Sequence, residues 1–164
     1  MNRTLLFLED AMKQPIDAYR YFFPAGWILG LWGVILWLLF PWGLVTYPGL
    51  QHPEIMTGGF FLCFVAGFLM NAAPKFTDTY PPTAGGHLLS SLLIGALLIT
   101  AVWFTRSVFY GVVFLIFIFL LRFVMVRFFQ RKGNPPSSFV FLRFGLISGL
   151  LASLVTAISE FTEV

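Results

Sequence analysis

The sequence contains little charge and almost no cysteine. Only 10% of its 164 residues are charged, whereas a soluble domain carries about a quarter. The single cysteine, Cys63, excludes an intrachain disulfide and any metal site built from several cysteines. No nucleotide-binding loop, nucleophile triad, HExxH sequence or paired-cysteine motif is present. Nothing therefore indicates a hydrolase, and we expect no nucleic-acid partner.

Apolar residues dominate the chain instead. They make up 59% of it, phenylalanine alone contributes 21 residues, and the mean hydropathy is +0.87. This composition is typical of an integral membrane protein in contact with a lipid bilayer. We expect residues 1–164 to form a single membrane domain.

Five apolar segments approach the ~20 residues that a helix needs to cross a bilayer. They cover about residues 21–45, 55–73, 88–104, 108–129 and 139–158. An open strand in lipid would leave backbone groups without partners, and these runs do not alternate in polarity as barrel strands do. The sequence thus predicts an all-α, polytopic membrane helix bundle of about five transmembrane helices. Residues 1–18 precede it, and their apolar positions at helical spacing predict a short interfacial amphipathic helix.

Basic residues indicate the orientation, because cytoplasmic loops of membrane proteins carry an excess of lysine and arginine. With five spans, Arg106 falls on one side and most other basic residues fall on the opposite side. These are Arg3, Lys13, Arg20, Lys75, Arg127, Arg131 and Lys132. The sequence predicts a bacterial inner-membrane protein with a cytoplasmic N-terminus. The odd number of spans also suggests association, either into a homo-oligomer or with another membrane subunit.

His52 precedes Pro53 at the outer mouth of the second predicted span. Proline suits the first turn of a helix, so His52 is expected at the cap position. A neutral imidazole there could ligate haem iron or copper, or it could be an ordinary loop histidine. Met56 lies one helical turn further on, so its thioether could face the same site or simply fill the core.

A stripe of small residues runs along the second predicted span. Gly59, Cys63 and Gly67 recur every four residues, and this spacing lets another helix or a flat macrocycle approach the backbone. Tight helix packing, a cofactor face and a contact with another chain are the interpretations that stay open.

His87 opens the third predicted span, on the opposite side of the membrane from His52. The two are separated by roughly 30 Å, so one iron cannot bind both within one chain unless a span is broken. Arg122 and Arg143 lie inside the fourth and fifth predicted spans, where charges usually face a bundle interior or a polar cavity.

These arginines belong to a predicted basic layer on the cytoplasmic side that also includes Lys75, His87 and Arg127. A basic inner pocket of this kind could hold haem propionates, a quinone or a lipid head group. The alternative is that the arginine side chains snorkel to the membrane surface.

Two segments resemble the N-terminal half of the NnrS family. They are YRYFFPAGWILGLWGVILWLL over residues 19–39 and HPEIMTGGFFLCFVAGFLMNAAPKFTDTYPPTAGGHLL over residues 52–89. Those polytopic membrane proteins are tied to the bacterial nitric-oxide response and are reported to contain haem and copper. The chain departs from the family where a histidine pair becomes His52 and Glu54, and where Lys75 and Phe76 replace an Asn-Trp pair.

The resemblance implies that His52 is a metal ligand, with haem b as the cofactor and copper as a second candidate. It favours an inner-membrane protein of the nitric-oxide response or of respiratory electron transfer; whether it is an enzyme stays open. One alternative is a non-catalytic accessory subunit of a larger respiratory or transport complex. Another is a small transporter with Arg122 and Arg143 along its path.

Overall fold

The computed structural model describes residues 17–103, 105–137 and 139–162, so most of the surface helix predicted over 1–18 lies outside the described part. The elements are α2 (Tyr19–Leu39), a 3₁₀ turn η1 (Phe40–Trp42), α3 (Gln51–Glu54), a π-helix η2 (Ile55–Phe61), α4 (Leu62–Thr77), α5 (Ala84–Val102), α6 (Arg106–Phe129) and α7 (Phe139–Thr162). Because α3, η2 and α4 follow one another directly, they make one long helix. Within the described ranges, five helices are long and apolar enough to cross a membrane, which confirms the predicted all-α bundle.

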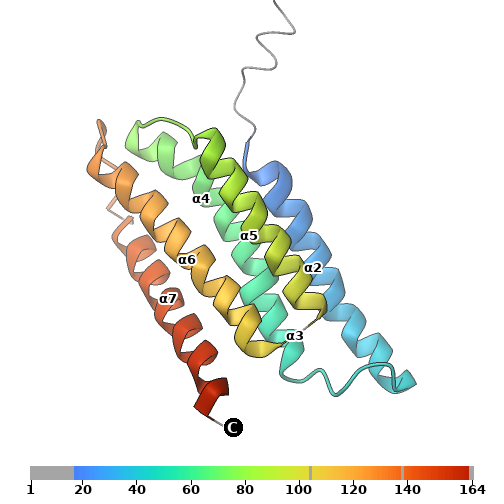
Figure 1. The fold of residues 1–164 in the computed structure, drawn as a ribbon. Helices are drawn as coiled ribbons and strands as arrows, with labels where there is room; N and C mark the ends of the chain where they lie inside the picture. The colour runs from blue at the N-terminus through green and yellow to red at the C-terminus, as the bar shows by residue number, and fades with distance from the viewer. Residues whose placement is uncertain (1–16, 104, 138, 163–164) are drawn as a thin grey trace, which may run out of the picture.

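The long helices run alternately up and down and lie side by side (Figure 1). The first one, α2, packs against η2, α4 and α5, and α6 packs against α4, α5 and α7. The last one, α7, stands at the edge of the bundle beside α6. The core between them is apolar and is built around large buried side chains such as Phe22, Leu29, Met70, Phe109 and Leu120.

The second helix is longer than the span predicted over 55–73. It begins at Gln51 and continues to Thr77, so Pro74 lies inside it. Asp78 ends it with a left-handed backbone, φ 50°, and its N–H reaches the carbonyls of Pro74 and Lys75. Hydropathy therefore located the apolar middle of this helix, whereas backbone capping sets its end.

The other boundaries shift for similar reasons. The first span ends in η1 at Trp42 rather than at residue 45, because Gly43 takes the left-handed conformation with φ 68°. The third span begins at Ala84 rather than at residue 88, because Thr83 Oγ1 accepts a hydrogen bond from the N–H of Gly86 at 3.2 Å.

Candidate functional site

His52 lies in the first turn of α3 and is held against α2. Its ring nitrogen Nδ1 lies 2.8 Å from the carbonyl oxygen of Gly33. A carbonyl oxygen only accepts hydrogen bonds, so Nδ1 carries a proton, and in the neutral imidazole the lone pair is on Nε2. The ring also meets Trp37 edge-on, with 5.9 Å between centroids. The predicted cap position is wrong, because Leu50 is the N-cap residue and α3 begins at Gln51.

Met56 and His52 contact the same surface of α2, as their spacing predicts. A Cβ atom on Gly33 would lie 3.2 Å from Met56 Sδ and 3.5 Å from His52 Nδ1. Both half-buried side chains therefore pack onto the bare backbone of Gly33, and a larger residue would displace them. Sequence reasoning missed Gly33, because its role depends on a contact with another helix.

The small-residue stripe of Gly59, Cys63 and Gly67 is covered by α2. A Cβ atom on Gly67 would lie 2.8 Å from Phe22 Cβ, and one on Gly59 would lie 3.3 Å from Leu29 Cδ1. Cys63 is 1% exposed. The stripe is thus a tight packing surface within the chain. Its predicted use as a cofactor face or as a contact with another chain is wrong, because α2 already fills it.

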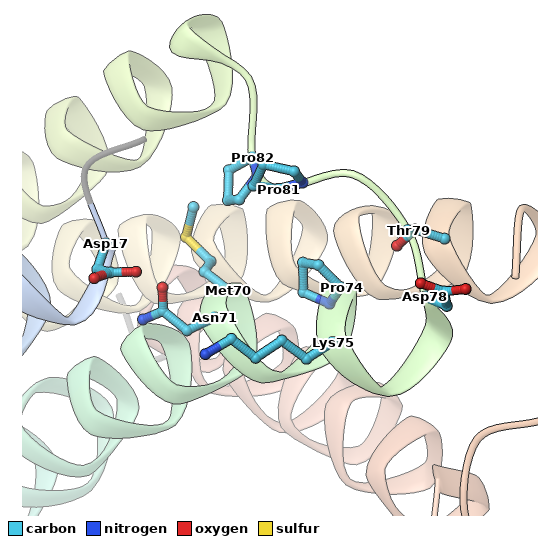
Figure 2. A pocket seen from close by; sticks show the side chains of 9 residues that line it. All are labelled: Asp17, Met70, Asn71, Pro74, Lys75, Asp78, Thr79, Pro81 and Pro82. Atoms are coloured by element: carbon cyan, nitrogen blue, oxygen red, sulfur yellow. The ribbon is translucent and has the colours of Figure 1, made fainter. Parts of the chain in front are cut away.

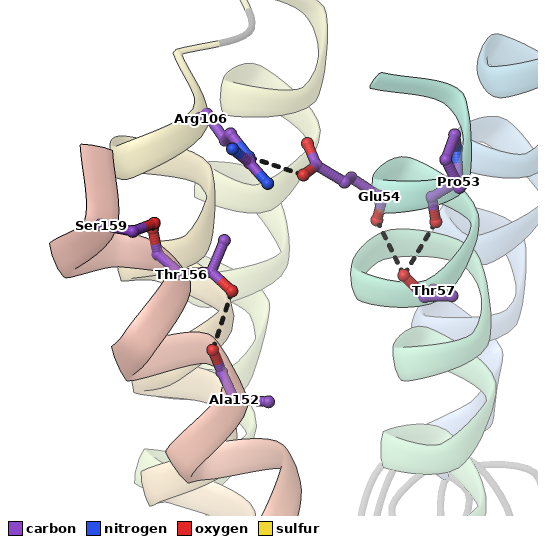
Figure 3. Close-up of polar contacts among 7 residues, drawn as sticks. All are labelled: Pro53, Glu54, Thr57, Arg106, Ala152, Thr156 and Ser159. Carbon is purple, nitrogen blue, oxygen red and sulfur yellow. Dashed lines mark hydrogen bonds and ion pairs between the residues drawn. The ribbon is translucent and has the colours of Figure 1, made fainter. Parts of the chain in front are cut away.

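Glu54 and Arg106 form an ion pair at the end of the bundle that carries His52. Arg106 Nε lies 2.6 Å from Glu54 Oε1, and the Glu54 side chain is only 11% exposed. Figure 3 shows Arg106 reaching from the start of α6 toward Glu54, with Thr156 and Ser159 of α7 at the same end. Sequence reasoning missed this pair. The available signal was the presence of opposite charges at the mouths of two spans that meet at one membrane face.

The π-helix η2 lies directly after Glu54. It comprises Ile55–Phe61, and Thr57 Oγ1 donates a hydrogen bond to the carbonyl of Pro53 at 2.8 Å where it begins (Figure 3). Short π-helical turns are rare in proteins overall, but those that occur are often found at functional sites. The wider turn changes the register of side chains between α3 and α4, which no pattern in the sequence predicts.

His87 lies at the other end of the bundle. Its Nδ1 is 2.9 Å from the hydroxyl of Tyr21, which is also 2.9 Å from Ser90 Oγ. The α2 partners of the two histidines, Tyr21 and Gly33, are about 18 Å apart along the helix. The structure therefore keeps His52 and His87 too far apart to bind one iron, as the span geometry predicts.

The predicted basic layer is divided among separate environments. Arg122 and Arg127 line a cavity of about 790 Å³ between α5 and α6. Arg143 instead stacks on Phe128, with 4.3 Å between its guanidinium carbon and the ring centroid. A single basic pocket that contains both Arg122 and Arg143 is therefore wrong, because the two side chains lie in different surroundings.

Lys75 lines a smaller cavity of about 370 Å³ together with Asp17, Asn71 and Asp78 (Figure 2). Asn71 is committed to the backbone, because its Oδ1 accepts a hydrogen bond from the N–H of Ala18 at 3.2 Å. Lysine and two aspartates leave this cavity with mixed charge, so it has no preference for an anionic group.

Within the described residues, no three His, Cys, Asp or Glu side chains gather where they could hold a metal ion. A metal on His52 would therefore take its other ligands from a macrocycle, from Met56 or from a second chain.

One protein-family model matches the chain over nearly its whole length. The family model described as NnrS protein matches residues 17–163. The match continues past residue 89, where the resemblance in the sequence stops, and covers α5, α6 and α7 as well. Neither the curated proteins nor the solved structures contain a match to this chain.

Proposed function

This chain belongs to the NnrS family, and we propose that it is a haem b-binding membrane protein of the bacterial nitric-oxide response, with copper as the second metal that its site could hold. The family match and the five apolar helices give the membrane setting. The proposal for the cofactor depends on one side chain, His52.

The observation that carries the proposal is the hydrogen bond from His52 Nδ1 to the Gly33 carbonyl. Histidines that bind metals commonly donate their other ring N–H to a carbonyl, which fixes the tautomer and the ring orientation and raises the basicity of the free nitrogen. In His52 that free nitrogen is Nε2. Trp37 against the ring further restricts its rotation.

Haem b, when bound, would supply an iron that takes up a diatomic gas or changes its oxidation state. Two residues of this chain would hold such a haem. His52 presents Nε2, and Met56 offers a thioether from the same surface of Gly33. Thioethers ligate haem iron and Cu(I), so Met56 is the second ligand candidate of this chain.

Replacement of His52 by alanine tests the proposal, and His87→Ala is the matched control, since these are the two histidines of the chain. The purified parent protein should show a Soret absorption band. His52→Ala should lose it, whereas His87→Ala should keep it, because His87 lies at the opposite end. A Soret band of full intensity in His52→Ala, or a parent protein without haem and without copper, would refute the assignment.

A spectral change without loss of the cofactor separates ligation from a merely structural role of His52. A methyl group at Gly33 would lie 3.2 Å from Met56 Sδ, which is closer than an ordinary contact, and 3.5 Å from His52 Nδ1. Gly33→Ala should therefore shift the Soret maximum while retaining haem. An unchanged spectrum would mean that neither side chain contacts the metal.

For the orientation, we propose that the protein lies in the bacterial inner membrane with the start of α2 on the cytoplasmic side. Arg20, Lys75, Arg127 and the loop after α6 are at that end. Arg106 is at the other end and is paired with Glu54. This asymmetry supports the orientation through the preference of basic loops for the cytoplasm.

A second candidate function is that of an accessory subunit, and the exposure of α7 favours it. In the apolar 18-residue stretch of α7 that could cross the membrane, only 17% is buried within the chain. The corresponding share is 44% for the long helix that begins at Gln51. A second copy or another membrane subunit could cover this face. Native mass measurement in mild detergent would support association if it shows a dimer or a complex, whereas a colourless monomer would argue against both candidate functions.

A further inference from the structure

The cavity between α5 and α6 has one polar end and long apolar walls. The connection from Tyr80 to Thr83 lines one end of the cavity. The side chains of Arg122 and Arg127 line the same end. Its volume of about 790 Å³ is within the range of natural ligand pockets.

The polar end carries positive charge without an acidic neighbour. None of the residues that line the cavity is an aspartate or a glutamate, and neither arginine forms an ion pair with a described residue. Arg127 is held in place, with its guanidinium carbon 3.3 Å from the Phe123 ring centroid and Nη1 donating to the Phe123 carbonyl. Its Nε is buried and has no hydrogen-bond partner in the described part of the chain.

The start of α5 adds a second, independent source of positive potential at this end. Thr83, Gly85 and Gly86 line the cavity, and they form the cap and first turn of a helix of 19 residues. A Cβ atom on Gly85 would meet only Thr83 Oγ1, at 4.0 Å, so the backbone there is open to a ligand. First-turn N–H groups and the helix dipole favour an anion such as phosphate.

The walls beyond this end are apolar. Leu89 and Leu93 come from α5, and Leu115, Ile118 and Phe119 come from α6. Leu115 lies about 10 Å nearer the start of α6 than Arg122. Leu89 and Ile118 are 48% and 41% exposed, so the groove opens sideways, toward the lipid around the bundle.

We propose that this groove binds one anionic phospholipid. The phosphate lies between the start of α5 and the two guanidinium groups, and an acyl chain lies along the leucine, isoleucine and phenylalanine walls. Anionic head groups are drawn to basic residues at the cytoplasmic surface. A free phosphate would satisfy the polar end but would leave the apolar walls uncovered, so the amphiphile fits the groove better.

Native mass spectrometry of the full chain from nanodiscs tests the proposal, with phosphatidylglycerol and phosphatidylcholine compared at equal amounts. The parent protein should retain one phosphatidylglycerol in preference to phosphatidylcholine. Replacement of both Arg122 and Arg127 by glutamine should lower that preference by about thirtyfold. Arg131→Gln is the matched control, because Arg131 is exposed and does not line the cavity.

A second variant keeps both charges and fills the groove. Leu89→Trp changes a half-exposed side chain, so the fold should tolerate it, and it should reduce phosphatidylglycerol retention as strongly as the double arginine variant. Equal retention of both lipids by the parent, or unchanged phosphatidylglycerol retention in both variants, would overturn the proposal. Displacement of the lipid by millimolar inorganic phosphate would overturn it in favour of a free anion. A fall in haem content in the double arginine variant would instead assign the arginines to the cofactor.

Discussion

Replacement of Gly67 by alanine should destabilise the fold, because it inserts a methyl group into the closest approach of α2 and α4. The added Cβ would lie 2.8 Å from Phe22 Cβ and 3.0 Å from Phe23 Cε1. Carbon atoms in favourable contact are ~3.5–4.0 Å apart, so about 1 Å must be gained at this point.

The size of the destabilisation depends on which atoms near the added Cβ can move away from it. Phe22 is 2% exposed, and its Cβ is attached to the backbone of α2, so a change of side-chain rotamer cannot remove the overlap. The helices must separate, and such overpacking typically costs about 1–3 kcal/mol. Alanine in place of glycine inside a helix returns up to about 1 kcal/mol. The difference is a net loss of about 0–2 kcal/mol in the free energy of unfolding, with a central value of about 1 kcal/mol.

Gly95→Ala is the matched control, because it makes the same chemical change inside α5, where a Cβ atom would have no neighbour within 4 Å. This variant should be unchanged or up to about 1 kcal/mol more stable. Both variants can be compared with the parent by titrating sodium dodecyl sulfate into mixed micelles and following helicity. Equal stability of the two variants would refute the close approach of α2 and α4.

Two further predictions concern the Glu54–Arg106 pair and the topology. Glu54 is buried and the Arg106 side chain is 33% exposed. Glu54→Gln should therefore lower the free energy of unfolding by about 2 kcal/mol, which lies between the values for exposed and buried ion pairs. The double variant with Arg106→Gln should lose less than the sum of the single variants in the same titration, and additive losses would mean that the pair does not couple. Reporter fusions after Gly49 and after Gly133 should report opposite sides of the membrane, with Gly49 outside. The same location for both would contradict the five-span arrangement.

The sequence was sufficient for the number of helices but not for their ends or contacts. Long apolar runs have few alternatives to a helix in lipid, so the five spans were predictable. Their ends depend on single residues such as Thr83 and Asp78 that cap the backbone. The change from α to π geometry between Glu54 and Leu62 does not produce a distinct spacing of apolar residues. The sequence therefore could not predict it.

The candidate site was predictable only in its local part. His52 and Met56 are one turn apart, and the structure places both on one surface. The surface itself belongs to α2, and the spacing within one helix cannot identify the neighbour that it meets. For the same reason, the stripe around Cys63 correctly indicated close packing but not that α2 would occupy it.

The two proposed sites should respond independently to substitution. His52 is two residues from Glu54, which pairs with Arg106 at the start of α6. Arg122 lies about 24 Å further along the same helix. Distant sites without shared contacts usually have additive effects. A variant that lacks phospholipid at Arg122 and Arg127 should therefore keep the spectrum of the His52 site, and His52→Ala should keep the lipid. Each substitution can thus serve as the folding control for the other, because a folded variant should lose only the ligand of its own site.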